Sequence, residues 1–222
     1  MKKYNSVNKL SICILALVLF GCGQKEKKAS TEIVLPYYNE ATFTPHWLAK
    51  DSDELNDFHQ IPEFSLVNQD GETITKKTLS GKIYVTNFFF TSCPGICPKM
   101  TTNLRLIQDA FLHDDDVLLL SHSVTPDFDS VPILKEYAQK KNVESGKWHL
   151  LTGDRDQIYS LGRNSYFVEE DLGLEKDNDD FLHTENVILV DQNGFIRGIY
   201  NGLNQASMTQ LIEDIQTLKS KL

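Results

Sequence analysis

The sequence has few cysteines, no long apolar run and no excess of basic residues, and each absence excludes a class of protein. Four cysteines among 222 residues are too few for a scaffold held together by disulfides. The apolar run of residues 10–20 is shorter than the ~20 residues that a permanent transmembrane helix needs. Lysine and arginine number 22 against 31 acidic residues, so the formal net charge is −9 and nucleic acid is not expected as a partner.

The first residues have the pattern of an export signal. Two lysines at the start precede the apolar run of residues 10–20, as in a secretory signal peptide. The run ends in Leu-Phe-Gly-Cys, which resembles the lipobox of bacterial lipoproteins. This resemblance implies a lipoprotein signal peptide over residues 1–21 and a lipid attached to Cys22. An ordinary secretory signal with an incidental cysteine is the alternative.

Export would determine which of the four cysteines remain as free thiols in the mature protein. The signal peptide would carry away Cys13 and lipid would cap Cys22, which leaves Cys93 and Cys97 as free thiols. We expect the domain to face the periplasm of a bacterial cell envelope, anchored to a membrane by the lipid. In an oxidising compartment an isolated cysteine pair is chemically conspicuous. The pair is therefore predicted to be a working site.

The chain after the signal divides into two regions. Residues 22–58 are polar and lack a clear period, which predicts a tether. Residues 59–222 are long enough for a single domain that buries roughly 70% of its unfolded surface.

Strand and helix patterns alternate through this domain. Asp70 and Gly71 between two short alternating segments predict a β-hairpin. Continuous apolar runs follow, which are typical of strands buried on both faces, and most are succeeded by helical spacing. The order predicts an α/β fold whose partly parallel sheet is covered by helices on both faces. The expected strands are 83–90, 117–124, 148–153 and two within 185–202, and the expected helices are 100–113, 131–141, 154–164 and 207–222.

Cys93 and Cys97 lie at the junction between strand 83–90 and the helix that follows it, where sites collect in α/β sheets. A helix that started near Pro94 or Gly95 would put the two cysteines one turn apart, with both sulfurs able to bind one ion at about 2.3 Å. A helix N-terminus also favours the thiolate, which is both nucleophile and metal ligand. The junction predicts a redox pair or a soft-metal site. A plain disulfide is a weaker alternative, because so short a loop gains little from closure.

Several separated stretches resemble the SCO/SenC family of copper-binding proteins. They are FFFTSCPGICP, SVTPDFDSVPILKEYA, the LTG at 151–153 and FLHTENVILVDQNGFI, which together span most of residues 60–220 in the expected order. The resemblance implies a thioredoxin-like fold, with a central mixed sheet flanked by helices on both faces and an N-terminal β-hairpin. Proteins of this family are anchored in membranes and are associated with assembly of the copper centre of cytochrome c oxidase.

The resemblance also implies the metal ligands. In the family, the two cysteines of a Cys-x-x-x-Cys motif and one distant histidine bind copper, and here these residues are Cys93, Cys97 and, by position, His183. Without the resemblance, His183 would be one of six histidines with little to distinguish it. Two thiolates suit Cu(I), and an added imidazole makes a site that can also hold Cu(II). Zinc would accept the same ligands but normally takes a fourth.

The sequence departs from the family pattern beside this site. After the second buried strand, Asp129 matches the last acid of the family, but Thr125 replaces the first carboxylate and Phe128 the usual basic residue. These changes alter the charge near the site and leave the ligands intact. His122, at the end of the same strand, is expected near the cysteine loop but in a packing or hydrogen-bonding role.

An acidic run at residues 169–180 leads to His183. Its simplest interpretation is a solvated loop. A mobile loop that delivers the histidine and attracts a cationic partner or metal is the other hypothesis.

The sequence thus supports a copper metallochaperone, a function that requires no substrate turnover, and leaves thiol-disulfide oxidoreductase activity open as an enzymatic role. Its expected partner is the copper-acceptor subunit of a respiratory oxidase or another cuproprotein. The alternative is a thiol-disulfide reductase that keeps the acceptor's cysteines reduced, with Cys93 or Cys97 attacking. A peroxide-reducing thiol enzyme fits less well, because it needs one thiolate and leaves His183 unexplained.

Overall fold

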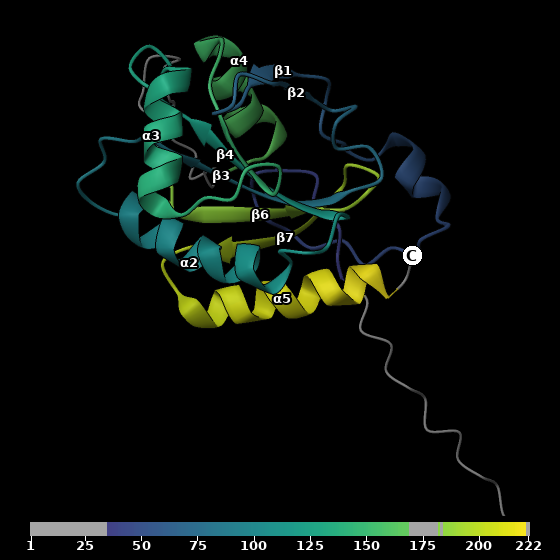
Figure 1. Ribbon diagram of the computed structural model, residues 1–222. Coiled ribbons are helices and arrows are strands. Elements are labelled where there is room, and N and C mark those ends of the chain that lie inside the picture. The colour runs from purple at the N-terminus through teal and green to yellow at the C-terminus, as the bar shows by residue number, and fades with distance from the viewer. Residues whose placement is uncertain (1–34, 169–181, 183, 221–222) are drawn as a thin grey trace, which may run out of the picture. The chain divides into compact units, whose positions relative to one another are not determined.

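The computed structural model describes residues 35–168, 182 and 184–220, and a five-stranded sheet lies at their centre (Figure 1). The strand order is β5-β4-β3-β6-β7. Strand β4 is parallel to β3 and β5, whereas β6 is antiparallel to β3 and β7. The predicted mixed sheet is confirmed. The strands are β3 (Ile83–Phe89), β4 (Val117–Ser123), β5 (Trp148–Leu151), β6 (Asn186–Val190) and β7 (Ile196–Asn201).

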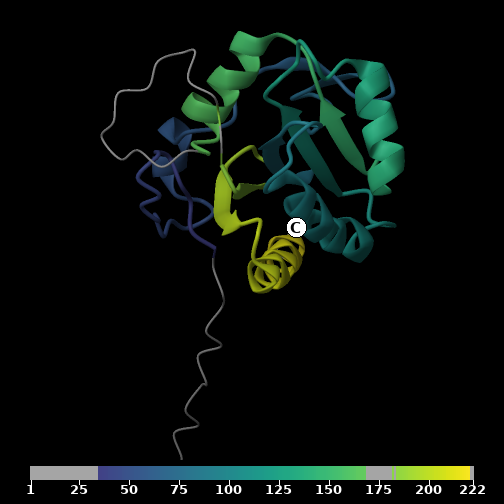
Figure 2. The same ribbon diagram turned by 90° about the vertical axis from the view of Figure 1, so that its left-hand side faces the viewer.

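Helices cover both faces of the sheet. One face carries α2 (Cys97–Ala110), α3 (Val131–Lys141) and α5 (Gln205–Lys219), whose buried side chains share one core cluster. The other face carries α4 (Arg155–Ser160), which continues into a short π-helix, Leu161–Ser165. Figure 2 shows the strands between α4, in green, and α3, in teal. The thioredoxin-like arrangement expected from the resemblance is present.

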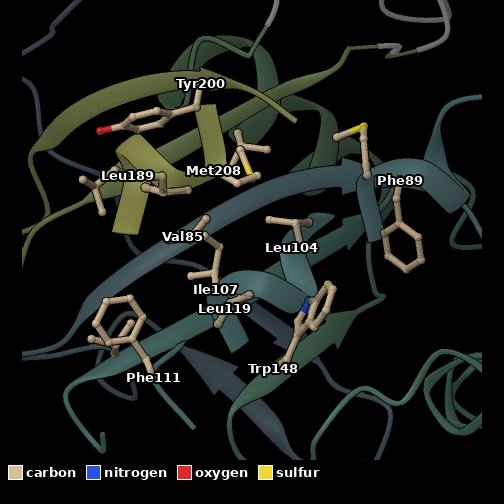
Figure 3. Packing of buried hydrophobic residues seen from close by; sticks show 14 of the residues in the cluster. Val85, Phe89, Leu104, Ile107, Phe111, Leu119, Trp148, Leu189, Tyr200 and Met208 are labelled. Atoms are coloured by element: carbon tan, nitrogen blue, oxygen red, sulfur yellow. The ribbon is translucent and has the colours of Figure 1, made fainter. Parts of the chain in front are cut away.

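Burial on both faces of the sheet explains why β3 and β4 carry mainly apolar side chains, although both also contain buried polar residues. Every residue of both strands is buried, and alternate side chains point to opposite faces. Figure 3 shows the cluster on the α2 face, where Leu104 and Ile107 of the helix lie close to Val85 and Leu119 of the strands. Strand β3 leads from this core directly to the cysteines.

The predicted hairpin is formed by β1 (Ser65–Val67) and β2 (Thr73–Thr75), which pair antiparallel. Gly71 in its turn has φ 79°, a conformation that glycine adopts without strain. The hairpin is joined to the end of β5 by a bridge between Val67 and Thr152.

The packed region begins earlier than the predicted boundary at residue 59. The Tyr38 N–H donates to the carbonyl of Ile196 at 3.1 Å, which adds a bridge to the edge strand β7. The guanidinium of Arg197 donates to the Leu35 carbonyl at 2.6 Å and pairs with Asp191 at 2.9 Å. Residues 35–58 are therefore held against the domain by backbone groups, by one buried cation and by contacts of Tyr37 and Phe58 with Phe195, which leave no periodic signal in the sequence.

Within the described residues, no helix is long and apolar enough to cross a bilayer. The signal peptide predicted over residues 1–21 and the lipidation site Cys22 lie outside those residues.

Candidate thiol and metal site

The two cysteines lie on either side of the start of α2. Strand β3 ends at Phe89, the chain turns, and α2 begins at Cys97, so that Cys93 lies in the turn and Cys97 in the first turn of the helix. The helix thus begins three residues before the predicted Met100, and it does not start near Pro94 or Gly95, the condition that would put both cysteines inside one helical turn. A proline disfavours helical conformation in the residue before it, and Pro98 fits the first helical turn, where its missing N–H is not needed.

Both thiols are reduced and buried, and they are hydrogen-bonded to each other. Cys93 is 8% exposed and Cys97 is 4% exposed. The N–H of Cys93 donates to the carbonyl of Phe90 at 3.3 Å. The sequence predicted two sulfurs able to share one partner, and the structure brings them into contact.

The environments of the two thiols separate their pKa values. Burial alone would raise the pKa of Cys93, but hydrogen bonds from the Cys97 thiol and from the N–H groups of Cys97, Gly95 and Ile96 outweigh it and lower that pKa. Burial raises the pKa of Cys97, and so does its hydrogen bond to Cys93. Cys93 is therefore the thiol that loses its proton first.

A tyrosine from α3 forms a wall of this site that the sequence did not reveal. The hydroxyl groups of Tyr137 and Thr101 lie 2.9 Å apart, and Thr101 also donates to the carbonyl of Cys97 at 2.9 Å. Burial raises the pKa of Tyr137, and charge on Cys97 or Cys93 acts in the same direction. Only the distant helix α3 brings Tyr137 here, so no local motif could have indicated it.

His122 packs in the core, as predicted, but on the other face of the sheet from the cysteines. It is fully buried, its Nδ1 lies 3.0 Å from the Thr86 hydroxyl, and its ring stacks on Phe88 at 4.8 Å between centroids. Its neighbours belong to the α4-side cluster, whereas Cys93 and Cys97 belong to the α2-side cluster. The expectation that His122 lies beside the cysteine loop is wrong, because side chains alternate along β4.

His183 and the acidic run 169–180 lie outside the described residues. The residues on both sides of His183 are described: Leu182 is 2% exposed and Thr184 is 8% exposed. The Thr184 hydroxyl donates to the carbonyl of Val168 at 2.7 Å. Among the described residues, no group of three or more histidine, cysteine or acidic side chains could hold a metal ion.

The sequence as a whole matches one family model. The SCO1/SenC model matches residues 52–220. The chain belongs to the SCO1/SenC family. The resemblance found in the separated sequence motifs is thus confirmed.

Solved structures of related proteins agree with this assignment. A SCO1/SenC family lipoprotein from Bacillus anthracis is 32% identical, with a TM-score of 0.63 over 72% of this chain and 95% of that chain. BsSco, a member of the Sco family of cytochrome c oxidase assembly proteins in which a disulfide switch was identified, is 26% identical, with a TM-score of 0.60 over 72% and 93%. Copper-bound ScoI from Bradyrhizobium japonicum is 26% identical, with a TM-score of 0.56 over 71% and 98%.

Proposed function

We propose that this SCO1/SenC protein is a membrane-anchored copper metallochaperone that delivers copper to a respiratory copper centre during cytochrome c oxidase assembly. The observation that carries the proposal is the contact between two buried, reduced thiols at the start of α2. A relative of the same fold holds copper, and another belongs to the cytochrome c oxidase assembly proteins. The proposed anchor is lipid on Cys22, and one relative is a lipoprotein.

The proposed ligands are Cys93, Cys97 and His183, with copper as the cargo. Thiolates are soft ligands that suit Cu(I), and the imidazole extends the site to Cu(II). Cys93 would bind first because its pKa is lowered, and Cys97 would lose its proton as the metal arrives. Ligands of the acceptor would then replace these residues one at a time.

Copper titration of the chain without its signal peptide tests this function. We expect one equivalent each of Cu(I) and Cu(II) to bind, with a thiolate-to-copper charge-transfer band in the Cu(II) form. His183→Ala should lower Cu(II) affinity by at least about 100-fold, since even loss of outer-shell contacts costs about 10–100-fold. It should affect Cu(I) much less, because both thiolates remain. The exposed His113 provides a control, as His113→Ala should behave like the wild type. Failure of both ions to bind stoichiometrically would contradict the proposal.

The second candidate is a thiol-disulfide reductase, and the difference between the two thiol pKa values favours it. The Cys93 thiolate would attack a partner disulfide and release one partner thiol. Cys97 would then close an intramolecular disulfide and release the second thiol, so that two electrons pass to the partner. His183→Ala should leave this exchange unchanged. If it slowed exchange as strongly as it weakened copper binding, the reductase candidate would be rejected.

A further inference from the structure

Asp129 is a buried carboxylate beside the cysteine turn. It is 1% exposed, and none of the ion pairs in the described part of the chain includes it. Instead it accepts hydrogen bonds from the Thr91 N–H (3.1 Å), the Thr91 hydroxyl (2.5 Å), the Ser123 hydroxyl (2.6 Å) and the Thr125 hydroxyl (3.1 Å). A carboxylate buried without a cation is tolerated only when its oxygens are satisfied in this way.

The donors to Asp129 come from separate parts of the fold. Thr91 follows the end of β3, Ser123 ends β4, and Thr125 lies in the connection to α3. The parallel strands β3 and β4 place Phe89 opposite Ser123. Asp129 therefore joins the carboxyl ends of two neighbouring strands at the edge where the cysteine turn begins.

The contacts continue from Thr91 to both cysteines through Phe90. The Phe90 carbonyl accepts the N–H of Cys93, and the Phe90 N–H donates to the thiol of Cys97. The residue that contacts both cysteines is thus the direct neighbour of the one that Asp129 holds. A shift of Thr91 would move the peptide group between Phe90 and Thr91, and with it the bond to Cys93.

We propose that Asp129 is a positioning residue for the thiol pair. By holding Thr91 against the end of β4, it fixes the turn so that the sulfurs of Cys93 and Cys97 stay adjacent. It acts through Thr91, because its hydrogen bonds go to Thr91, Ser123 and Thr125. The inference rests on the proposed function of Cys93 and Cys97 as the working thiols.

The test is the stability of the Cys93–Cys97 disulfide in a glutathione buffer. In this equilibrium, the two protein thiols are oxidised to a disulfide while oxidised glutathione is reduced to two glutathione thiols. Asp129→Asn keeps the size of the side chain but replaces one acceptor oxygen by a donor. We expect the equilibrium constant for disulfide formation to fall about tenfold, which raises the reduction potential by about 30 mV. The reason is that, when the turn is held less firmly, the two sulfurs spend less time in the geometry that forms the disulfide.

Asp127 offers a matched control two residues away. It is exposed, and Asp127→Asn removes the same charge from the same connection. We expect its disulfide equilibrium to stay within about twofold of the wild type. A purely structural role for Asp129 would lower the melting temperature and leave the equilibrium unchanged in the folded protein. That result would overturn the proposal.

Threonine variants keep the test valid if Asp129→Asn does not fold. Thr91→Val removes the hydroxyl contact to the turn but keeps the carboxylate, and we expect a fall of about threefold in the same equilibrium constant, about 14 mV. Thr125→Val removes a donor that lies away from the turn, so its effect should be smaller. If Thr91→Val and Thr125→Val lowered the equilibrium constant equally, or if neither changed it, the role of Thr91 would be overturned.

The copper titration separates failure of this inference from failure of the proposed function. If the wild type binds copper but Asp129→Asn leaves the disulfide equilibrium unchanged, positioning alone is rejected. If the wild type binds no copper but the equilibrium shifts, the metallochaperone is rejected and the positioning role stands.

Discussion

Acid should destabilise this protein through His122, and a substitution can isolate the effect. The ring is fully buried, and its Nε2 has no hydrogen-bond partner in the described part of the chain. Burial lowers the pKa of His122 to about 3, because the apolar and aromatic surroundings disfavour the charged imidazolium. His122→Leu removes the titrating group and keeps the position apolar.

The sign and size of the effect follow from the two pKa values. In the unfolded chain the histidine takes up its proton near pH 6.5, whereas in the folded protein it does so only near pH 3. Between these values the unfolded state binds more protons, so the free energy of unfolding falls by about 1.4 kcal/mol per pH unit as the pH drops. From pH 6.5 to 4.5 the loss is about 2 kcal/mol, because the unfolded histidine is already half protonated at pH 6.5, and this is a substantial share of the about 5–15 kcal/mol of a typical domain.

Urea unfolding of the reduced protein at several pH values between 6.5 and 4.5 measures this loss. The wild type should lose about 2 kcal/mol more than His122→Leu over that range. The variant should be less stable at pH 6.5, because it gives up the stacking on Phe88 and the contact with Thr86. His113→Leu, at an exposed histidine, should keep the wild-type slope. Parallel pH profiles for the wild type and His122→Leu would refute the reasoning.

Two further substitutions test close packing and a buried charge. A Cβ at Gly162 would lie 2.7 Å from Cδ2 of Leu182 and 3.1 Å from the Phe88 ring, so Gly162→Ala should cost about 1–3 kcal/mol in urea unfolding. Wild-type stability would show that Leu182 moves aside freely. Arg197→Met leaves the Asp191 carboxylate buried without its cation and should cost about 3–5 kcal/mol in thermal unfolding. Adding Asp191→Asn should recover part of that loss. A double variant no more stable than Arg197→Met alone would contradict the charge argument.

The elements that the sequence predicts well are those whose side chains carry the packing signal. Strands β3 and β4 are buried on both faces, so most of their residues are apolar, and only their predicted C-terminal ends differ from the structure, each by one residue. The start of α2 was placed three residues too late, at Met100 instead of Cys97, because Pro98 and Lys99 in the first turn are not buried and add nothing to the apolar periodicity. The segment from residue 35 was missed because it is attached by a backbone hydrogen bond, by the side chain of Arg197 and by aromatic contacts with Phe195, none of which leaves a periodic pattern.

The candidate site likewise contains residues that the sequence could predict and residues that it could not. Cys93 and Cys97 are close in sequence, so spacing alone indicated that they could meet. Asp129, in the connection after β4, and Tyr137, on α3, reach the site only through the folding of the chain, and sequence distance hides such contacts. The inequality of the thiol pKa values likewise depends on which N–H groups the folded turn presents to each sulfur.

The two departures from the family pattern near Asp129, Thr125 and Phe128, have different physical effects. A carboxylate at position 125 would lie within reach of the Asp129 carboxylate and repel it, whereas Thr125 supplies a hydrogen bond at 3.1 Å. Phe128, where the family usually has a basic residue, is 75% exposed and provides no cation. Relative to the family pattern, Thr125 removes a negative charge and Phe128 removes a positive one, so the local net charge is unchanged. Asp129 meanwhile gains the Thr125 hydroxyl as a hydrogen-bond donor. Its hold on Thr91 therefore depends on neutral N–H and hydroxyl donors instead of a cationic side chain, and should be insensitive to salt.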